Sequence, residues 1–367
     1  MRDLLMFAIV FCSLPFMLKR PAIGVLMFTW LSLMNPHRLS YGAAYDFPFA
    51  ALVAGATFIG ILVSKQEKRR PIGTVIIILI LFIFWVTFTT FFALESERAW
   101  IEWSRVMKTF LMTLVAMYVI SSKKDIKLFA WIVGLSLGFY GLKGGVFTIF
   151  SGGVNRVFGP EQSYIADNNH LALALLTSLP IIWYLILHTE RRWLRFGYSC
   201  LALLTLISVV GTYSRGALLA GSAMLGFLWL KSRYKSRTAL AFFVILPIVL
   251  AIMPEQWFDR MQSINDYKED ASAMGRFNAW YFAFNLAKDT LIGGGFDVFT
   301  PGLFLVYAPD PLDFHVAHSI YFQVLGEHGF IGLLLFLLLM LFAWRTGDRI
   351  IKVSKGNDEL KWASDLA

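Results

Sequence analysis

Apolar residues in this chain form long uninterrupted runs separated by short polar segments. A run of about 20 mostly apolar residues is long enough to cross a bilayer as a helix. Eleven runs approach that length, and they cover residues 3–18, 21–34, 48–63, 72–93, 104–121, 127–150, 169–188, 195–211, 216–231, 238–253 and 318–345. The pattern therefore predicts an all-α polytopic membrane protein with about 11–12 transmembrane helices.

The first 34 residues leave the count open. Their two runs are short and are separated by Lys19 and Arg20, so they form either two crossings or one tilted hairpin. Residues 1–18 resemble a signal peptide, but Lys19-Arg20-Pro21 stands where small residues should mark a cleavage site, which favours an uncleaved anchor. Eleven spans place the N-terminus outside, whereas an even count places both ends in the cytoplasm.

The composition excludes a soluble enzyme, a disordered chain and a fibrous protein. Hydrophobic residues make up 57% of the 367 residues and charged residues 16%, with a mean hydropathy of +0.64. Soluble domains carry about 25% charged residues. Two cysteines, Cys12 and Cys200, lie within apolar runs, so we expect neither a disulfide nor a cysteine metal site.

The net charge of +9 is explained by the orientation of the chain in the membrane. Basic residues gather in alternate loops, at 65–70, 123–127, 190–195 and 231–237, and in the tail after 345. Lysine and arginine accumulate in the cytoplasmic loops of membrane proteins. The loops at 35–47, 94–103, 151–168, 212–215 and 254–317 are then predicted to face outward. The surplus charge thus requires no nucleic acid as a partner, and membrane lipids are the expected surroundings.

The segment 254–317 is the one large predicted extramembrane loop. It carries a net charge of −5, and its centre, 279–291, has apolar residues at helical spacing (Trp280, Phe284, Ala287 and Leu291). Three glycines, 293–295, are expected to end this amphipathic helix. A loop of this length indicates a functional cap rather than a connector.

Arg215 is the sharpest candidate for a functional residue. It lies with Ser214 and Gly216 in a very short outward turn between two apolar runs. A snorkelling arginine at the headgroup level is the simple alternative. However, a hydroxyl, a guanidinium and a glycine that admits close backbone approach suit a phosphate.

Arg276, His315 and His318 are the candidates in the long loop. Arg276 precedes the amphipathic helix, where free N–H groups favour anions, although a surface arginine would need no such role. Asp313-X-His315-X-X-His318 matches no common zinc pattern, so a histidine that accepts a proton is the better functional interpretation, with a satisfied interfacial histidine as the alternative.

Weaker candidates for substrate binding lie near the same predicted face. They are Arg156, Asn168, Arg105 and Lys108, and each could also snorkel, as could Lys143, which lies inside an apolar run and could line a polar cavity. The outward loops contain no Asp-X-Asp pair, and the chain has no phosphate loop and no Gly-X-Ser-X-Gly elbow. We therefore expect neither a metal nor another cofactor.

These residues fit glycosyl transfer from a lipid carrier. Two arginines can neutralise a departing diphosphate as a metal ion would elsewhere, and a histidine can accept the proton of an attacking hydroxyl. The many aromatic residues supply walls for prenyl chains and platforms for sugars, although ordinary membrane packing explains most of them.

The ordered motifs resemble the O-antigen ligase and polymerase superfamily. The similarity spans about residues 150–345 and rests on Tyr213-Ser214-Arg215-Gly216-Ala217, Gly275-Arg276-Phe277-X-X-Trp280, Leu291-Ile292-Gly293-Gly294-Gly295, and His318-Ser319-X-Tyr321 with Glu327-X-Gly329. Residues 30–38 and 45–50 look like the exosortase-associated O-glycosylation ligases.

The resemblance implies a fold and a reaction. It implies a GT-C-like helical fold in the bacterial inner membrane, with an N-terminal bundle at 1–150, a catalytic region at 151–345 and a cytoplasmic tail at 346–367. It implies metal-independent, inverting transfer from undecaprenyl diphosphate to lipid A–core at the periplasmic face. His318 would be the base, Arg215 and Arg276 would hold the diphosphate, and Trp280 and Tyr321 would contact substrate, while His315 has no matching role.

Two alternatives stay open at this point. The acceptor can instead be a growing polysaccharide or a protein, because the sequences of the acceptor-binding loops do not indicate which acceptor they bind. A flippase or exporter of lipid-linked glycans belongs to another class and would need polar residues along a path through the bilayer. Here only Lys143 is placed for such a path.

Overall fold

The computed structural model describes residues 1–65, 72–231, 235–262 and 271–367, and it divides the chain into two compact units. Most of the basic loop at 65–70, Arg233, and the charged residues 266 and 268–270 lie outside the described residues. The first unit comprises 1–68 and 119–264, and the second comprises 69–118 and 265–367. Each unit is described by itself.

The first unit contains the helices α1 (Arg2–Lys19), α2 (Pro21–Met34), α3 (Phe49–Val63), α6 (Lys123–Phe150), α7 (Asn168–Leu187), α8 (Arg192–Gly211), α9 (Arg215–Lys231), α10 (Lys235–Leu250) and α11 (Glu255–Gln262), with a 3-10 turn at Pro36–Leu39. The second contains α4 (Thr74–Phe91), α5 (Ser96–Val119), α12 (Ala271–Asp289), α13 (Pro301–Tyr307), α14 (Ile320–Ser354) and α15 (Lys361–Leu366), with a 3-10 turn at Asp358–Leu360. The described residues contain no strand.

The chain is an all-α polytopic membrane protein, as the sequence predicts. Among the described residues five helices are long and apolar enough to cross a bilayer, and these are α4, α6, α7, α8 and α14. Shorter apolar helices cover 21–34, 49–63 and 215–230. The expected total of 11–12 crossings and the GT-C-like arrangement stay predictions.

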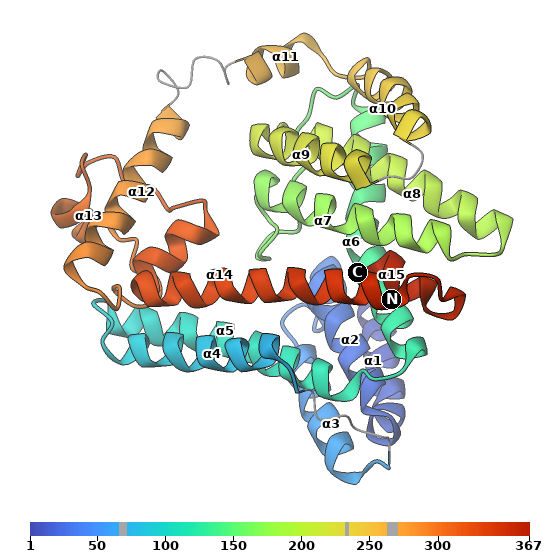
Figure 1. The fold of residues 1–367 in the computed structure, drawn as a ribbon, viewed down its shortest axis with the longest axis horizontal. Coiled ribbons are helices and arrows are strands. Elements are labelled where there is room, and N and C mark those ends of the chain that lie inside the picture. Colours follow the sequence, from blue (N-terminus) through green and yellow to red (C-terminus); the bar gives the residue numbers. More distant parts are fainter. Residues whose placement is uncertain (66–71, 232–234, 263–270) are drawn as a thin grey trace. The chain divides into compact units, whose positions relative to one another are not determined.

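Small residues bring α6 and α8 into close contact within the first unit (Figure 1). A Cβ atom on Gly141 would lie 2.2 Å from the hydroxyl of Thr205, and one on Gly145 would lie 2.2 Å from the Leu204 carbonyl. Small residues at such spacing let helix backbones approach in lipid. Lys143, between these glycines, lines a separate cavity of about 470 Å³ together with Arg2 and Trp30.

The last long helix, α14, is broken at Gly329 (φ 66°, ψ −169°) and lies beside α4 in the second unit (Figure 1). A break leaves helix carbonyls without their usual N–H donors, which is costly in lipid. Gly294 N–H donates to the Gly326 carbonyl at 2.9 Å, and Gly295 N–H donates to the Glu327 carbonyl at 2.8 Å. The indole of Trp85 donates to the next carbonyl, that of His328, at 2.9 Å.

Two expectations about helix limits need correction. The helix predicted at 279–291 is longer and begins earlier, since α12 covers Ala271–Asp289 and ends before the three glycines. Its buried apolar residues are Ala279, Phe282, Ala283, Leu286 and Ala287, of which Ala287 was predicted, whereas Phe284 and Leu291 are exposed. The stripe shifts because α12 packs against α13 and α14 along the 279–286 face. Likewise, α5 begins at Ser96 rather than at 104, because its amphipathic first turns extend the apolar run.

The close contact between the turn at 291–295 and the break in α14 predicts that position 329 tolerates no side chain. A Cβ atom on Gly329 would lie 2.0 Å from the Leu291 carbonyl, and φ is positive there. We expect Gly329→Ala to destabilise the protein by more than about 2 kcal/mol, because backbone atoms cannot move aside cheaply. Thermal unfolding in detergent measures the loss.

Gly302→Ala is the matched control, because a Cβ atom there meets nothing within 4 Å. This substitution should leave the midpoint temperature of thermal unfolding unchanged or slightly raised. Equal midpoints for the two variants would contradict the proposed contact.

Candidate functional site

The turn between α8 and α9 in the first unit comprises Thr212, Tyr213 and Ser214 and is held from several sides. Tyr213 adopts a left-handed backbone conformation (φ 59°), and its hydroxyl donates to the Gly153 carbonyl at 2.6 Å. The Asn168 side-chain amide donates to the Thr212 carbonyl at 2.8 Å, and Arg260 Nε donates to the Tyr213 carbonyl at 3.1 Å. A strained residue persists only where its surroundings fix it, and such residues cluster at functional sites.

Two helix N-termini meet at this turn. The Ser214 hydroxyl accepts from Ala217 N–H at 3.1 Å and so caps α9, and it donates to Asn169 Oδ1 of α7 at 2.7 Å. Asp167 caps α7 through the N–H groups of Asn169 (2.8 Å) and His170 (3.4 Å). The positive ends of two helix dipoles are therefore neighbours, which favours an anion.

Besides Arg260, two arginines accompany these helix ends. Arg215 is the first residue of α9 and is half-buried, with the small and exposed Gly216 after it. Arg156 is exposed and lies with its guanidinium 5.6 Å from the centre of the Tyr213 ring. Burial raises the pKa of the Tyr213 phenol, and the Arg156 charge opposes that rise. The structure thus brings together Arg156, Asn168, Ser214 and the Arg215 turn.

Arg260 is a residue whose role the sequence did not reveal. In the sequence it counts only as one charge of a long acidic loop. In the structure α11 carries it to the Tyr213 carbonyl, and Trp257 of the same helix donates its indole N–H to the Val210 carbonyl at 3.0 Å. The amphipathic character of residues 255–262 is the signal that could have indicated this packing.

In the second unit, α12 holds the segment that carries the two histidines. The side-chain amide of Asn278 donates to the carbonyls of Asp310 (2.7 Å) and Asp313 (2.8 Å), and its oxygen accepts from Asp310 N–H at 2.9 Å. Trp280 donates to the Ala317 carbonyl at 2.8 Å and stacks on Phe322 with ring centres 4.8 Å apart. The buried Asn278 was not among the sequence candidates, because nothing in the sequence shows its three partners.

Arg276 and His315 lie on adjacent parts of this assembly. The His315 ring packs on Gly275, where a Cβ atom would approach Nδ1 to 2.4 Å. His315 Nδ1 lies 3.1 Å from Asp313 Oδ1, within ion-pair range but without hydrogen-bond geometry. Arg276 Nε is buried and has no hydrogen-bond partner among the described residues. A buried donor of this kind is satisfied by an anion or by water.

His318 and Tyr321 stand at the start of α14. His318 is exposed and left-handed (φ 46°), and Ser319 after it is the N-cap residue of the helix. Tyr321 is 44% exposed, and its ring lies 6.1 Å from that of Phe336. His318, like Tyr213, is therefore a non-glycine residue in a sparsely populated conformation.

Arg105 and Lys108 lie on α5 in the second unit. Both are exposed on α5, and Arg105 donates to Glu102 of its own helix at 2.8 Å. An exposed ion pair of this kind contributes little to stability. The structure does not bring either residue to the histidine segment by any contact that we observe in the second unit, so their substrate-binding role stays a prediction.

A buried acidic residue, Glu327, fixes the glycine turn. Its Oε1 accepts from Asp297 N–H at 3.1 Å and from the Gln323 side-chain amide at 3.2 Å. The next residue, His328, is buried and has its Nδ1 2.7 Å from the Thr89 hydroxyl. Ionisable groups at membrane depth are costly and therefore mark function or a fixed structural role. No group of three or more potential metal ligands occurs among the described residues.

The fold defines a class of protein, an all-α multi-pass membrane protein. Two families match the chain: a family of unknown function (DUF5935) over residues 1–190, and the O-antigen ligase family over residues 200–337. The DUF5935 match covers just over half of the chain, so the chain belongs to that family, and the match at 200–337 supports the O-antigen ligase superfamily for its second half. Comparison with curated proteins and with solved structures gives no match.

The cap of α7 predicts a pH-dependent contribution to stability. Partial burial would raise the pKa of Asp167, but hydrogen bonds from Asn169 and His170 outweigh it and hold the pKa below its ordinary value of 3.8. The carboxylate therefore stabilises the fold above about pH 4, and this stability is lost as the pH falls through the lowered pKa.

We expect Asp167→Ala to lower the free energy of unfolding by about 1 kcal/mol at pH 7 and by progressively less below pH 3.8. Asp167→Asn should remain close to the unmodified protein at pH 7, because an amide oxygen also caps a helix. Thermal unfolding from pH 3 to 7 tests this. An Asn variant as unstable as the Ala variant would show that the cap is not the cause.

Proposed function

We propose that this protein transfers a glycan from undecaprenyl diphosphate to a sugar hydroxyl of lipid A–core at the periplasmic face of the bacterial inner membrane. One observation carries the proposal. The O-antigen ligase match at 200–337 contains Arg215 and His318, which stand at the starts of helices, and Arg276, whose Nε is buried without a hydrogen-bond partner among the described residues. Arg276 was expected to precede its helix, but it lies within α12. The superfamily role is established by the match, whereas the donor, the acceptor and the residue roles are proposed.

The proposed reaction is a single displacement at the anomeric carbon. The acceptor oxygen forms a bond to that carbon as the bond to the diphosphate oxygen breaks, so the configuration inverts. His318 accepts the proton of the attacking hydroxyl, which requires an exposed imidazole such as the one observed. The diphosphate leaves with its negative charge, and fixed cations stabilise it more as the charge develops.

Arginine suits the diphosphate for geometric reasons. Its planar guanidinium donates two parallel hydrogen bonds to phosphate oxygens. Arg276 offers a buried Nε without a partner among the described residues, and Arg215 stands beside the N-termini of α7 and α9. Arg156, Ser214, Gly216 and Asn168 would complete the anion site of the first unit, and Trp280, Tyr321 and His315 would line the acceptor side.

The acceptor is best settled by direct competition. Purified protein in liposomes would receive a lipid-linked glycan together with lipid A–core, free repeat units or a protein acceptor. Transfer to lipid A–core supports the proposal. Transfer only to another glycan or to protein would identify a polymerase or a protein ligase of the same superfamily. Movement of the donor across the membrane without any new bond would instead show a flippase.

The assignment of the base predicts the effect of one substitution. His318→Ala should lower the rate of transfer by about 100-fold or more, because a general base contributes at least that factor. Donor binding should be retained, since the diphosphate contacts are intact. Turnover of radiolabelled donor measures the rate, and donor binding in the same liposomes measures the affinity.

His37→Gln is the control, since the His37 ring packs near Phe49 in the N-terminal part of the first unit. It should transfer at the normal rate. Full transfer by the His318 variant would overturn the assignment of the base.

A further inference from the structure

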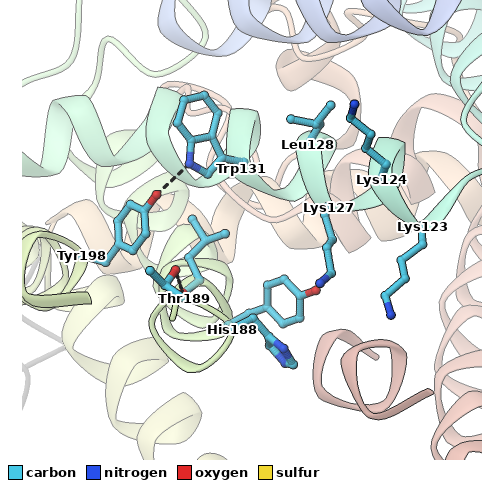
Figure 2. A pocket seen from close by; sticks show the side chains of 10 residues that line it. Lys123, Lys124, Lys127, Leu128, Trp131, His188, Thr189 and Tyr198 are labelled. Carbon is cyan, nitrogen blue, oxygen red and sulfur yellow. Dashed lines mark hydrogen bonds between the residues drawn. The ribbon is translucent and has the colours of Figure 1, made fainter. Parts of the chain in front are cut away.

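A cavity of about 640 Å³ lies at the ends of α6, α7 and α8 that are opposite to the Tyr213 turn. It is lined by Lys123, Lys124, Lys127, Leu128, Trp131, Tyr184, Leu185, His188, Thr189 and Tyr198 (Figure 2). All ten residues belong to the first unit. The glycosyl-transfer chemistry proposed above uses none of them.

The mouth of the cavity is strongly basic. Three lysines follow one another over the first turns of α6, and Figure 2 shows their side chains along this helix. The carboxylate in this stretch, Asp125, is already engaged, since Arg20 donates to it at 2.5 Å and Ser122 at 2.7 Å. The α6 N-terminus adds the positive end of a helix dipole. The positive charge of the lysines is therefore not cancelled by their neighbour in sequence.

The character of the lining changes along the helix. Trp131 follows Lys124 by seven residues, which is about 10 Å along a helix. Its indole donates to the Tyr198 hydroxyl at 2.8 Å, as Figure 2 shows, and Leu128 and Leu185 provide apolar surface. Basic, apolar and aromatic side chains thus line one cavity, as the phosphate and the adjoining apolar part of a phospholipid require.

We propose that this cavity binds the phosphate headgroup of an anionic phospholipid, with phosphatidylglycerol as the chemical type. Basic pockets between transmembrane helices bind such headgroups, and tryptophan and tyrosine favour the lipid interface. The site lies on the side where the loops 123–127 and 190–195 predict the cytoplasm. Orientation alone would require the lysines, but it would require neither a cavity nor a paired Trp131 and Tyr198 beside them.

The test counts bound lipids on the full chain. Protein purified in detergent is titrated with phosphatidylglycerol or phosphatidylcholine and examined by native mass spectrometry. We expect phosphatidylglycerol to bind at least tenfold more tightly. Lys124→Ala with Lys127→Gln should remove this preference, because each lysine near a headgroup contributes about a fivefold factor. Lys124→Ala alone changes an exposed position and should lower the affinity for phosphatidylglycerol about fivefold. This single variant keeps the test valid if the double variant does not fold.

Arg191→Ala is the matched control, because it removes one exposed charge from the same predicted face without touching the lining. It should keep the full preference for phosphatidylglycerol. An equal loss in this control would show diffuse surface charge rather than a site and would overturn the proposal. Displacement of the lipid by millimolar inorganic phosphate would also overturn it, since the acyl region would then play no part.

Discussion

The structure of the second unit depends on the hydrogen bonds that the backbone carbonyls receive at the break in α14. The break at Gly329 stands beside three successive carbonyls, those of Gly326, Glu327 and His328, and lipid offers no donors to carbonyls at a disturbed part of a helix. Gly294, Gly295 and Trp85 supply the three donors, and the close approach of the 291–295 turn to residues 327–329 requires glycine on both sides. Glu327 then binds Asp297 N–H and so fixes the chain beyond the turn. The glycines are thus needed to hold the turn that follows α12 against the helix that follows His318.

Arg215 and His318, one in each unit, share one physical feature, since each stands at the start of a helix on a turn that contains a left-handed residue. Tyr213 and His318 are both left-handed, and each turn is tied down by side chains from a neighbouring helix, Arg260 and Asn168 in one case and Asn278 and Trp280 in the other. Rigid placement matters for catalysis because fixed donors need no reorganisation when charge develops. The lysine cavity at the opposite ends of α6, α7 and α8 adds a second polar region in the first unit, of a different kind.

The sequence predicted the helices well, because apolar runs report directly on which segments can lie in lipid. The limits of α2 agree to the residue and those of α3 and α8 within a few residues. The break in α14 was not predicted, because Gly329 lies within an apolar run that has no interruption in the sequence. The buried stripe of α12 was displaced, since aromatic residues such as Phe284 suggest burial that the packing gives to Ala279 and Ala283. The long-range contacts of Arg260, Asn278 and Glu327 could not be predicted, because these partners are 30 or more residues away and no local pattern encodes such contacts.

The central claim is that arginine holds the diphosphate of the donor in place of a metal ion. The direct measurement is glycan transfer by the liposome-reconstituted protein in excess EDTA, compared with that of Arg215→Lys and Arg276→Lys variants. The account predicts full transfer with the chelator. It also predicts a weakened donor affinity in both variants, because lysine keeps the charge but loses the bidentate geometry. Transfer that is abolished by EDTA and restored by Mg²⁺, with unchanged donor affinity in the lysine variants, would contradict it.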